Sequence, residues 1–226
     1  VSEYKHQYLQ EYVGYLQSIQ KTPSDDALFL REPDYVPYSE NYKLPDMIYP
    51  YLQQGFIRSG EYGKDSVLIL DASSADGGHH HYDSLNIVYT KYNREILVDL
   101  GYLTDHPNLS FVQATVAHQT VLIDANNQIG SGRGGEFHLF DTSINDTKIM
   151  QASSHPYSGI ETYHRTLIQI DHENKNNYVV DIFRSTGGKK RRELVFHGPN
   201  NEYTLNKPLD FKDNYEIVPA PALIEF

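Results

Sequence analysis

The chain has 226 residues, of which 39% are hydrophobic, and a formal net charge of −11 at pH 7. A chain of this length and apolar content buries a core of its own, which excludes a disordered protein. The acidic balance argues against nucleic-acid binding, because neutralising phosphates requires Lys and Arg clustered over a broad face. The absence of cysteine excludes disulfides and thiolate metal sites, and no apolar run is long enough to span a bilayer, so no membrane partner is expected.

Residues 1–50 are predicted to form an N-terminal helix and a connecting segment. Over residues 2–20, tyrosines and aliphatic residues recur every three to four positions, which is typical of one face of a helix. Thr22 and Pro23 end this pattern, and the following residues to position 50 show no hydrophobic period. Because the rest of the chain is strand-like, we expect this helix to pack on a helical partner outside the sequence.

Residues 51–226 are predicted to form an all-β domain, an antiparallel β-sandwich. Short runs rich in β-branched and aromatic residues alternate with turns rich in Gly, Asn and Asp. No helical pattern separates these runs, which argues against a βαβ fold. The predicted strands cover residues 56–58, 66–70, 85–91, 95–100, 115–123, 136–140, 148–152, 160–170, 178–183 and 193–196.

The residues best suited to chemistry lie at positions 77–83, which read Gly-Gly-His-His-His-Tyr-Asp. In an extended chain, side chains two positions apart share a face, so His79, His81 and Asp83 project together. We take His81 as one metal ligand, Asp99 at the end of the returning strand as the second, and His118 as the third. Two imidazoles and a carboxylate suit a divalent metal ion, with Zn²⁺ as the expected ion.

The turn between the strands at 85–91 and 95–100 provides a test of this hypothesis. With a two-residue turn at positions 92–93, Asp99 lies on the face opposite His81. A three-residue turn pairs Asp99 with Ile87 and places its carboxylate on the face of His81. The metal hypothesis therefore predicts the longer turn or a bulge.

Two other interpretations stay open from the residues alone. In the first, the histidines form an exposed polar loop without a ligand. In the second, His81 and Asp83 join a distant histidine, His138 or His155, as the facial triad of an iron oxygenase, with Arg165 as the anchor for an oxo-acid.

Several segments resemble, in order along the chain, the signatures of the heparinase II/III-like polysaccharide lyases. The resemblance spans residues 51–198 and implies that this chain is the antiparallel β-sandwich of such an enzyme, whose N-terminal α/α toroid is the missing partner. The segments are GFIRS at 55–59, GHHHYDSL at 78–85, ILVDLG at 96–101, AHQTV at 117–121, YHRT at 163–166, VVD at 179–181 and FHG at 196–198.

The resemblance also implies roles for individual residues. In this family the first histidine of the His-x-His-x-Asp pattern faces the substrate and takes part in catalysis, which falls on His79. The second histidine is a ligand in the zinc-containing members, which falls on His81, and Asp99 and His118 occupy the matching positions of the other two ligands. Gln119 replaces the asparagine that usually follows the last of these histidines.

The activity implied by the resemblance is β-elimination on an anionic polysaccharide that contains uronic acid, such as a glycosaminoglycan or an alginate-like polymer. A base abstracts the C5 proton and the 4-linked sugar leaves, so His79 is expected to neutralise the substrate carboxylate or to transfer a proton. We expect an extracellular or periplasmic protein that is a poor enzyme without the toroid. The alternative function is a non-catalytic carbohydrate-binding sandwich.

Overall fold

The computed structural model describes residues 43–74, 80–101, 106–130, 134–172 and 176–199. The chain divides into two compact units, Val1–Leu44 and Pro45–Phe226, and the elements described below all belong to the second. The helix predicted over residues 2–20 lies outside the described residues, as does most of the connecting segment.

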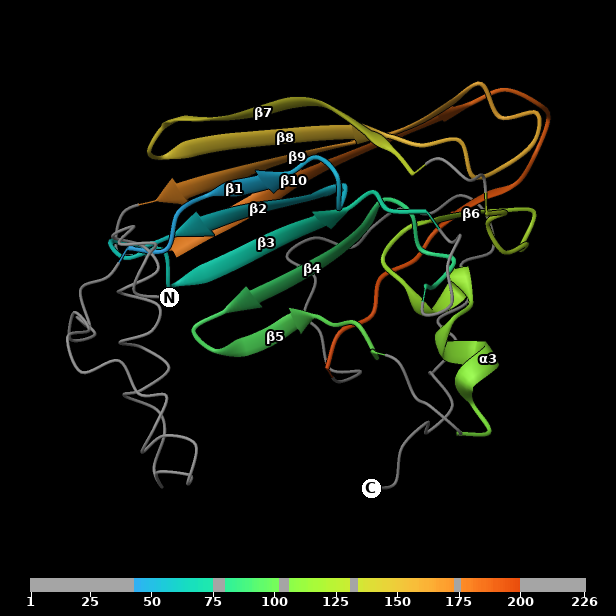
Figure 1. Ribbon diagram of the computed structural model, residues 1–226, viewed down its shortest axis with the longest axis horizontal. Coiled ribbons are helices and arrows are strands. Elements are labelled where there is room, and N and C mark those ends of the chain that lie inside the picture. The colour runs from blue at the N-terminus through green and yellow to red at the C-terminus, as the bar shows by residue number, and fades with distance from the viewer. Residues whose placement is uncertain (1–42, 75–79, 102–105, 131–133, 173–175, 200–226) are drawn as a thin grey trace, which may run out of the picture. The chain divides into compact units, whose positions relative to one another are not determined.

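The first sheet has five antiparallel strands in chain order (Figure 1). In the two strands at its middle, every second residue is buried, as in Ile57, Leu68 and Leu70. This period of two is expected of strands with one face in the core. The strands are β1 (Met47–Tyr49), β2 (Gln54–Ser59), β3 (Ser66–Asp71), β4 (Asn86–Lys91) and β5 (Arg94–Leu97).

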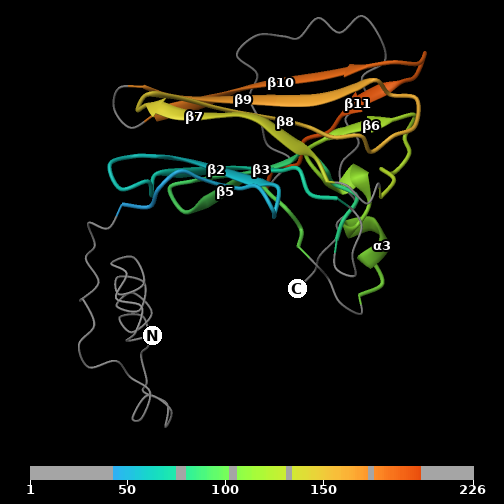
Figure 2. The ribbon, with the colours of Figure 1, turned by 45° about the horizontal axis from the view of Figure 1, so that its top comes forward.

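The second sheet has four antiparallel strands in the order β10-β9-β8-β7. Its members are β7 (Glu136–Ile144), β8 (Thr147–Ser153), β9 (Thr162–His172) and β10 (Asn176–Thr186). Figure 2 shows this sheet as a layer over the first, and Met150 and Leu167 pack against the core residues of the first sheet. The predicted antiparallel sandwich is therefore confirmed.

Two short helices and a two-stranded sheet lie at one end of the sandwich (Figure 1). They are α3 (Leu109–Val112), the 3₁₀ helix η1 (Thr115–Ala117), and β6 (Val121–Ile123), which pairs with β11 (Arg192–Leu194). No described helix is long and apolar enough to cross a membrane.

The strand predicted over residues 115–123 is wrong in its first half. Thr115 is fully buried, and its hydroxyl accepts a hydrogen bond from the backbone N–H of Gln128. Its own N–H donates to the side chain of Asn127. These bonds between side chains and backbone replace the ladder of a strand, so the chain forms a single 3₁₀ turn before β6 begins.

The hairpin of β4 and β5 combines a two-residue turn with a bulge. Both turn residues, Tyr92 and Asn93, have positive φ angles of 48° and 58°, as a type I′ turn requires. The register then shifts by one residue between Tyr89 and Thr90. The extra residue moves Asp99 to the other face of the strand, so the predicted alternative of a bulge is confirmed.

Candidate metal centre

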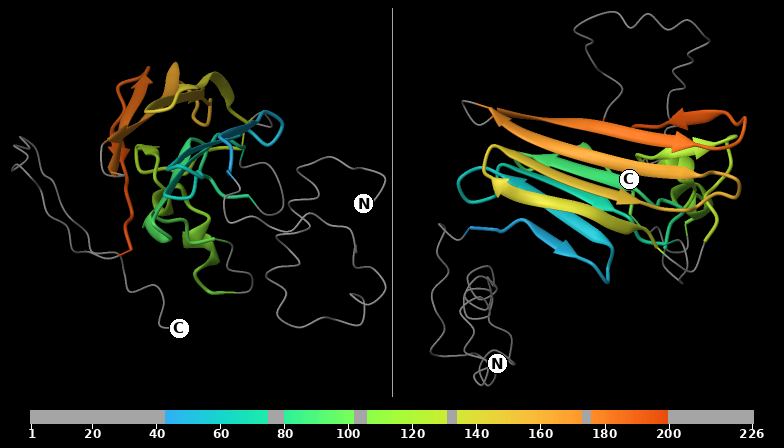
Figure 3. Two further views of the ribbon diagram at one scale, coloured as in Figure 1. Left: turned by 90° about the vertical axis from the view of Figure 1, so that its left-hand side faces the viewer. Right: turned by 90° about the horizontal axis from the view of Figure 1, so that it is seen from above.

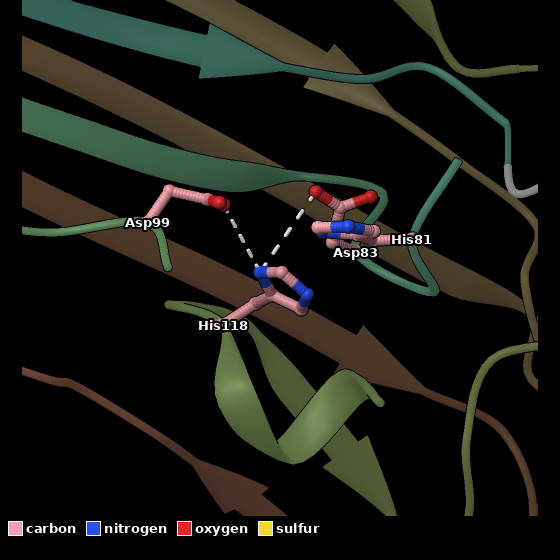
Figure 4. Close-up of side chains that lie close together, drawn as sticks. All are labelled: His81, Asp83, Asp99 and His118. Carbon is pink, nitrogen blue, oxygen red and sulfur yellow. Dashed lines mark hydrogen bonds and ion pairs between the residues drawn. The ribbon is translucent and has the colours of Figure 1, made fainter. Parts of the chain in front are cut away.

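Four side chains that are far apart in the sequence gather at the end of the first sheet. His81 and Asp83 come from the loop before β4, Asp99 follows β5, and His118 follows η1. Each offers one ligand atom, and these four atoms lie within 4.8 Å of one another. Figure 4 shows the two carboxylates directed toward the same imidazole, that of His118.

The His118 ring is fully buried at the centre of this group. Its Nδ1 lies 3.2 Å from Oδ2 of Asp99 and 3.9 Å from Oδ2 of Asp83. The ring of His81 is tilted by 37° against it, with 5.0 Å between the ring centroids. The Asp99 side chain keeps 26% of its surface exposed, so the group opens to solvent on that side.

Asn86, the first residue of β4, connects the three segments that carry these side chains. Its side-chain amide donates to Oδ2 of Asp99 at 3.0 Å, and its Oδ1 accepts from the backbone N–H of Gln119 at 2.9 Å. The N–H of Gly101 donates to Oδ1 of Asp99 at 2.8 Å. The Asp99 carboxylate is therefore oriented by protein groups without any ion.

Arg165 supports the same loops from the second sheet. Its fully buried guanidinium pairs with Asp181, with hydrogen bonds of 3.0 and 2.6 Å. The Nη1 group donates to the carbonyl of Leu85 at 2.8 Å and to that of Gln119. Leu85 lies two residues after Asp83, and Gln119 directly follows a histidine of the centre, so one guanidinium joins both segments.

These contacts argue against the iron oxygenase interpretation. The Arg165 guanidinium is fully buried and bound to protein groups, which excludes it as an anchor for an oxo-acid. The imidazole of His138 contacts Ser153 and His164 on the second sheet. Among the described residues, the cluster that could hold a metal includes neither His138 nor His155.

The electrostatics separate the two carboxylates. Burial raises the pKa of Asp83 to about 6, more than the nearby His118 lowers it. Burial also acts to raise the pKa of Asp99, but its hydrogen bond to His118 and the charge of that ring outweigh this and lower it to about 2. Asp99 is thus ionised over the whole physiological range, whereas Asp83 ionises near pH 6.

The two imidazoles are shifted in opposite directions. Burial, and then the charge of His118, lowers the pKa of His81. Burial acts in the same direction on His118, but its hydrogen bond to Asp99 and the charges of Asp83 and Asp99 raise its pKa. A bound cation would replace the His118 proton as the positive partner of the carboxylates.

The residues present fit a divalent metal ion. Two imidazole nitrogens and two carboxylates are a common donor set for Zn²⁺ and similar ions. Within the described part of the chain, Nε2 of His118 is buried and has no hydrogen-bond partner, a costly arrangement for a polar atom. The cluster could therefore bind a metal ion.

The structure brings together the three residues predicted as ligands, His81, Asp99 and His118, and adds Asp83 to them. Asp83 was not in the predicted ligand set, although its spacing of two from His81 placed both side chains on one face. His79 lies outside the described residues, so its catalytic role stays a prediction.

Comparison with known proteins places this geometry in context. Residues 43–209 match the family model described as heparinase II/III-like, C-terminal. No curated protein sequence matches the chain. Two solved structures are similar to it, with low sequence identity that shows the fold alone.

The first is heparinase III, the BT4657 gene product, with a TM-score of 0.62 and 14% identity over 87% of this chain. The second is the heparan sulfate lyase HepC from Pedobacter heparinus, with a TM-score of 0.55 and 16% identity over 80% of this chain. The matched regions cover 30% and 28% of those longer chains.

Proposed function

Because the chain belongs to the heparinase II/III-like C-terminal family, we propose that it is the β-sandwich part of a polysaccharide lyase that cleaves uronic-acid-containing glycans by β-elimination. The observation that carries this proposal is the meeting of His81, Asp99 and His118 directly after His79 in the family pattern. The two similar structures, both named as heparinase or heparan sulfate lyase, support the same class of substrate.

The chain spans about 30% of the length of these lyases. We therefore propose that further catalytic groups come from an N-terminal α/α toroid, and that the substrate, an anionic polysaccharide, binds between the toroid and the sandwich. On this view the isolated chain is a poor enzyme.

The roles of the chain's own residues follow from the chemistry of β-elimination. The C5 proton of a uronic acid is weakly acidic, so the enzyme must neutralise the substrate carboxylate and place an acid and a base near the reacting atoms. His79 is proposed to do one of these tasks at the substrate.

The metal centre is proposed to hold His79 in place. Bound between His81, Asp83, Asp99 and His118, a divalent ion such as Zn²⁺ would supply positive charge and cross-link the loop before β4 to two neighbouring segments. Since His79 lies two residues before His81, an ordered ligand fixes the backbone that presents the catalytic imidazole.

The test is the absorbance of the unsaturated uronate that β-elimination leaves at the new chain end. The natural full-length protein is incubated with a panel of sulfated and unsulfated uronate polymers. His79→Ala should lower the rate by about 10²- to 10⁴-fold, the typical contribution of an acid–base group. His106→Ala is the matched control, because His106 is exposed and outside the cluster.

Product formation that is unaffected by His79→Ala contradicts the assigned role. Binding of a uronate polymer by the full-length protein with no unsaturated product from any polymer favours the carbohydrate-binding alternative.

A further inference from the structure

A second group of polar side chains crosses the outer face of the four-stranded sheet. In the strand register, Ser153 of β8 pairs with His164 of β9, and His164 pairs with Arg184 of β10. On the other side, Nε2 of His138 in β7 lies 2.6 Å from Oγ of Ser153. These four residues, called the outer row here, lie side by side over the four strands that Figure 3 shows from above.

The alternation of burial shows that the outer row faces away from the core. In β9, the neighbours Tyr163 and Arg165 are buried, while His164 between them is partly exposed. In β10, Arg184 belongs to the exposed set of alternating residues. The row therefore belongs to a surface that the candidate metal centre does not use.

The two imidazoles of the row are held together. The rings of His138 and His164 stack with 5.6 Å between centroids and an interplanar angle of 23°. Ser153 is only 6% exposed, and its hydroxyl bonds to the first of these rings. A stack of this kind with an arginine next to it is stable when the rings are neutral and repels itself when they are charged.

The row is also short of negative charge. Within the described residues, no hydrogen bond or ion pair involves the Arg184 guanidinium, although the protein carries a net charge of −11. Burial and then the positive charges of His138, Arg184 and His155 lower the pKa of His164. The exposed Glu136 pairs with Ser153 at the β7 edge, so the positive end of the row is at β9 and β10.

Next to the row stand groups that suit the hydroxyls of a sugar. The adjacent outward residues are Gln151 of β8 and Thr166 of β9, joined by a hydrogen bond of 2.6 Å from the amide to the hydroxyl. Ile182 of β10 continues this second line and is 43% exposed. A cationic line beside an amide, a hydroxyl and an apolar side chain matches the mixed surface of an acidic sugar.

We propose that the outer row is a surface binding site for an acidic sugar of a polysaccharide, whose carboxylate or sulfate group bonds to Arg184 and His164. The choice of a glycan as ligand rests on the proposed function. An anion here supplies the missing partner of the guanidinium and relieves the repulsion between that guanidinium and the two imidazoles. Gln151 and Thr166 bond to neighbouring hydroxyl groups of the same chain.

The experiment measures binding to the natural full-length protein by calorimetry, with two probes: a heparin-derived tetrasaccharide, which carries sulfate, and a hyaluronan tetrasaccharide, which carries carboxylate alone. Arg184→Gln and His164→Asn are each expected to weaken binding of at least one probe about tenfold or more. Arg94→Gln, at the exposed turn of β4 and β5, is the matched control and leaves binding unchanged. Loss for both probes identifies the carboxylate as the bound group, and loss for the heparin probe alone identifies the sulfate.

A second readout is specific to the row. In a histidine NMR titration, saturation with the bound tetrasaccharide should raise the pKa of His164, because an anion favours the charged ring. Affinities that neither variant changes, together with a His164 titration that the probes do not alter, overturn the proposal.

Failure of this proposal and failure of the lyase proposal are distinguishable. Loss of binding in Arg184→Gln, in a protein that forms no unsaturated product, leaves the outer row standing and removes the lyase activity. Unsaturated product with tetrasaccharide binding independent of the outer row gives the opposite result.

Discussion

Asp83 illustrates how one residue of the centre acts against stability and for binding. Its carboxylate keeps only 15% of its side-chain surface exposed and ionises near pH 6 in the folded chain, compared with 3.8 for the free group. A carboxyl group whose pKa is raised on folding destabilises the protein increasingly as pH rises from about 4 to about 6. The penalty is present in full at pH 7, where a bound cation offsets it.

The Asp83→Asn variant tests this at the residue scale. Without metal at pH 7, we expect it to raise the free energy of unfolding by about 1–2 kcal/mol, since each unit of pKa shift corresponds to about 1.4 kcal/mol. Zn²⁺ affinity should fall at the same time. Urea unfolding in chelator and calorimetric titration with Zn²⁺ measure the two effects, and Asp146→Asn, in the turn of β7 and β8, is the control. A variant that is less stable than the wild type contradicts the sign.

Arg165 is the residue on which the two sheets and the candidate centre jointly depend. Arg165→Met leaves the Asp181 carboxylate and the carbonyls of Leu85 and Gln119 without their donor. Breaking a buried ion pair in this way costs about 3–5 kcal/mol. Urea unfolding should show this loss, and the double variant with Asp181→Leu should recover part of it, because no charge is then left alone. A loss below about 1 kcal/mol contradicts the assigned support.

At the scale of the element, the β4–β5 hairpin controls the candidate centre through its bulge. The extra residue turns the end of β5 by one position, which moves Asp99 from one face of the strand to the other. The turn type alone would have placed this carboxylate away from His81. The position of a metal ligand therefore depends on an irregularity of the backbone.

Deletion of Ile96 tests the bulge directly. Without this residue the two-residue turn runs into a regular ladder, so Asp99 should point away from His118 and Zn²⁺ binding should be lost. Ile96→Ala is the matched control, because the side chain is 41% exposed and its replacement leaves the backbone register intact. Calorimetry measures the binding, and circular dichroism checks that the sheet is kept. Unchanged affinity in the deletion variant means that the bulge does not position the ligand.

At the scale of the whole molecule, the candidate centre ties together three segments that the sheets alone do not join. A ligand that binds only the folded state at 100 times its dissociation constant adds about 2.7 kcal/mol to the free energy of unfolding. Zn²⁺ should therefore raise the unfolding temperature at pH 7.5, and a chelator should reverse the rise. His118→Ala is expected to abolish the effect, because it removes the buried ligand.

The same stabilisation should decline with acidity. Metal binding requires the ionised form of Asp83, whose pKa is about 6, and the deprotonated form of His118, whose pKa is raised. Both groups become protonated as pH falls through 6, so most of the effect of Zn²⁺ should be absent at pH 5. Thermal unfolding at the two pH values measures it, and equal stabilisation at both contradicts the assigned ligands.

Much of the molecule could be predicted from local patterns. The alternation of Ile57, Leu68 and Leu70 with polar residues is enough to identify strands with one buried face, because side chains in a strand alternate over two residues. The His-x-His-x-Asp pattern likewise indicated a ligand-bearing segment. The 3₁₀ turn at Thr115 was missed, because the hydrogen bonds that hold it come from residues 127 and 128.

The sequence by itself thus determined the antiparallel sandwich and the kinds of side chain available for a metal ion. Only the tertiary structure decided that Asp83 joins the other three residues, that Arg165 bonds to protein carbonyls, and that His138 stacks on His164. The physical reason is the range of the interactions. Alternation is a property of neighbouring residues, whereas these meetings depend on strand register, one bulge and the packing of two sheets.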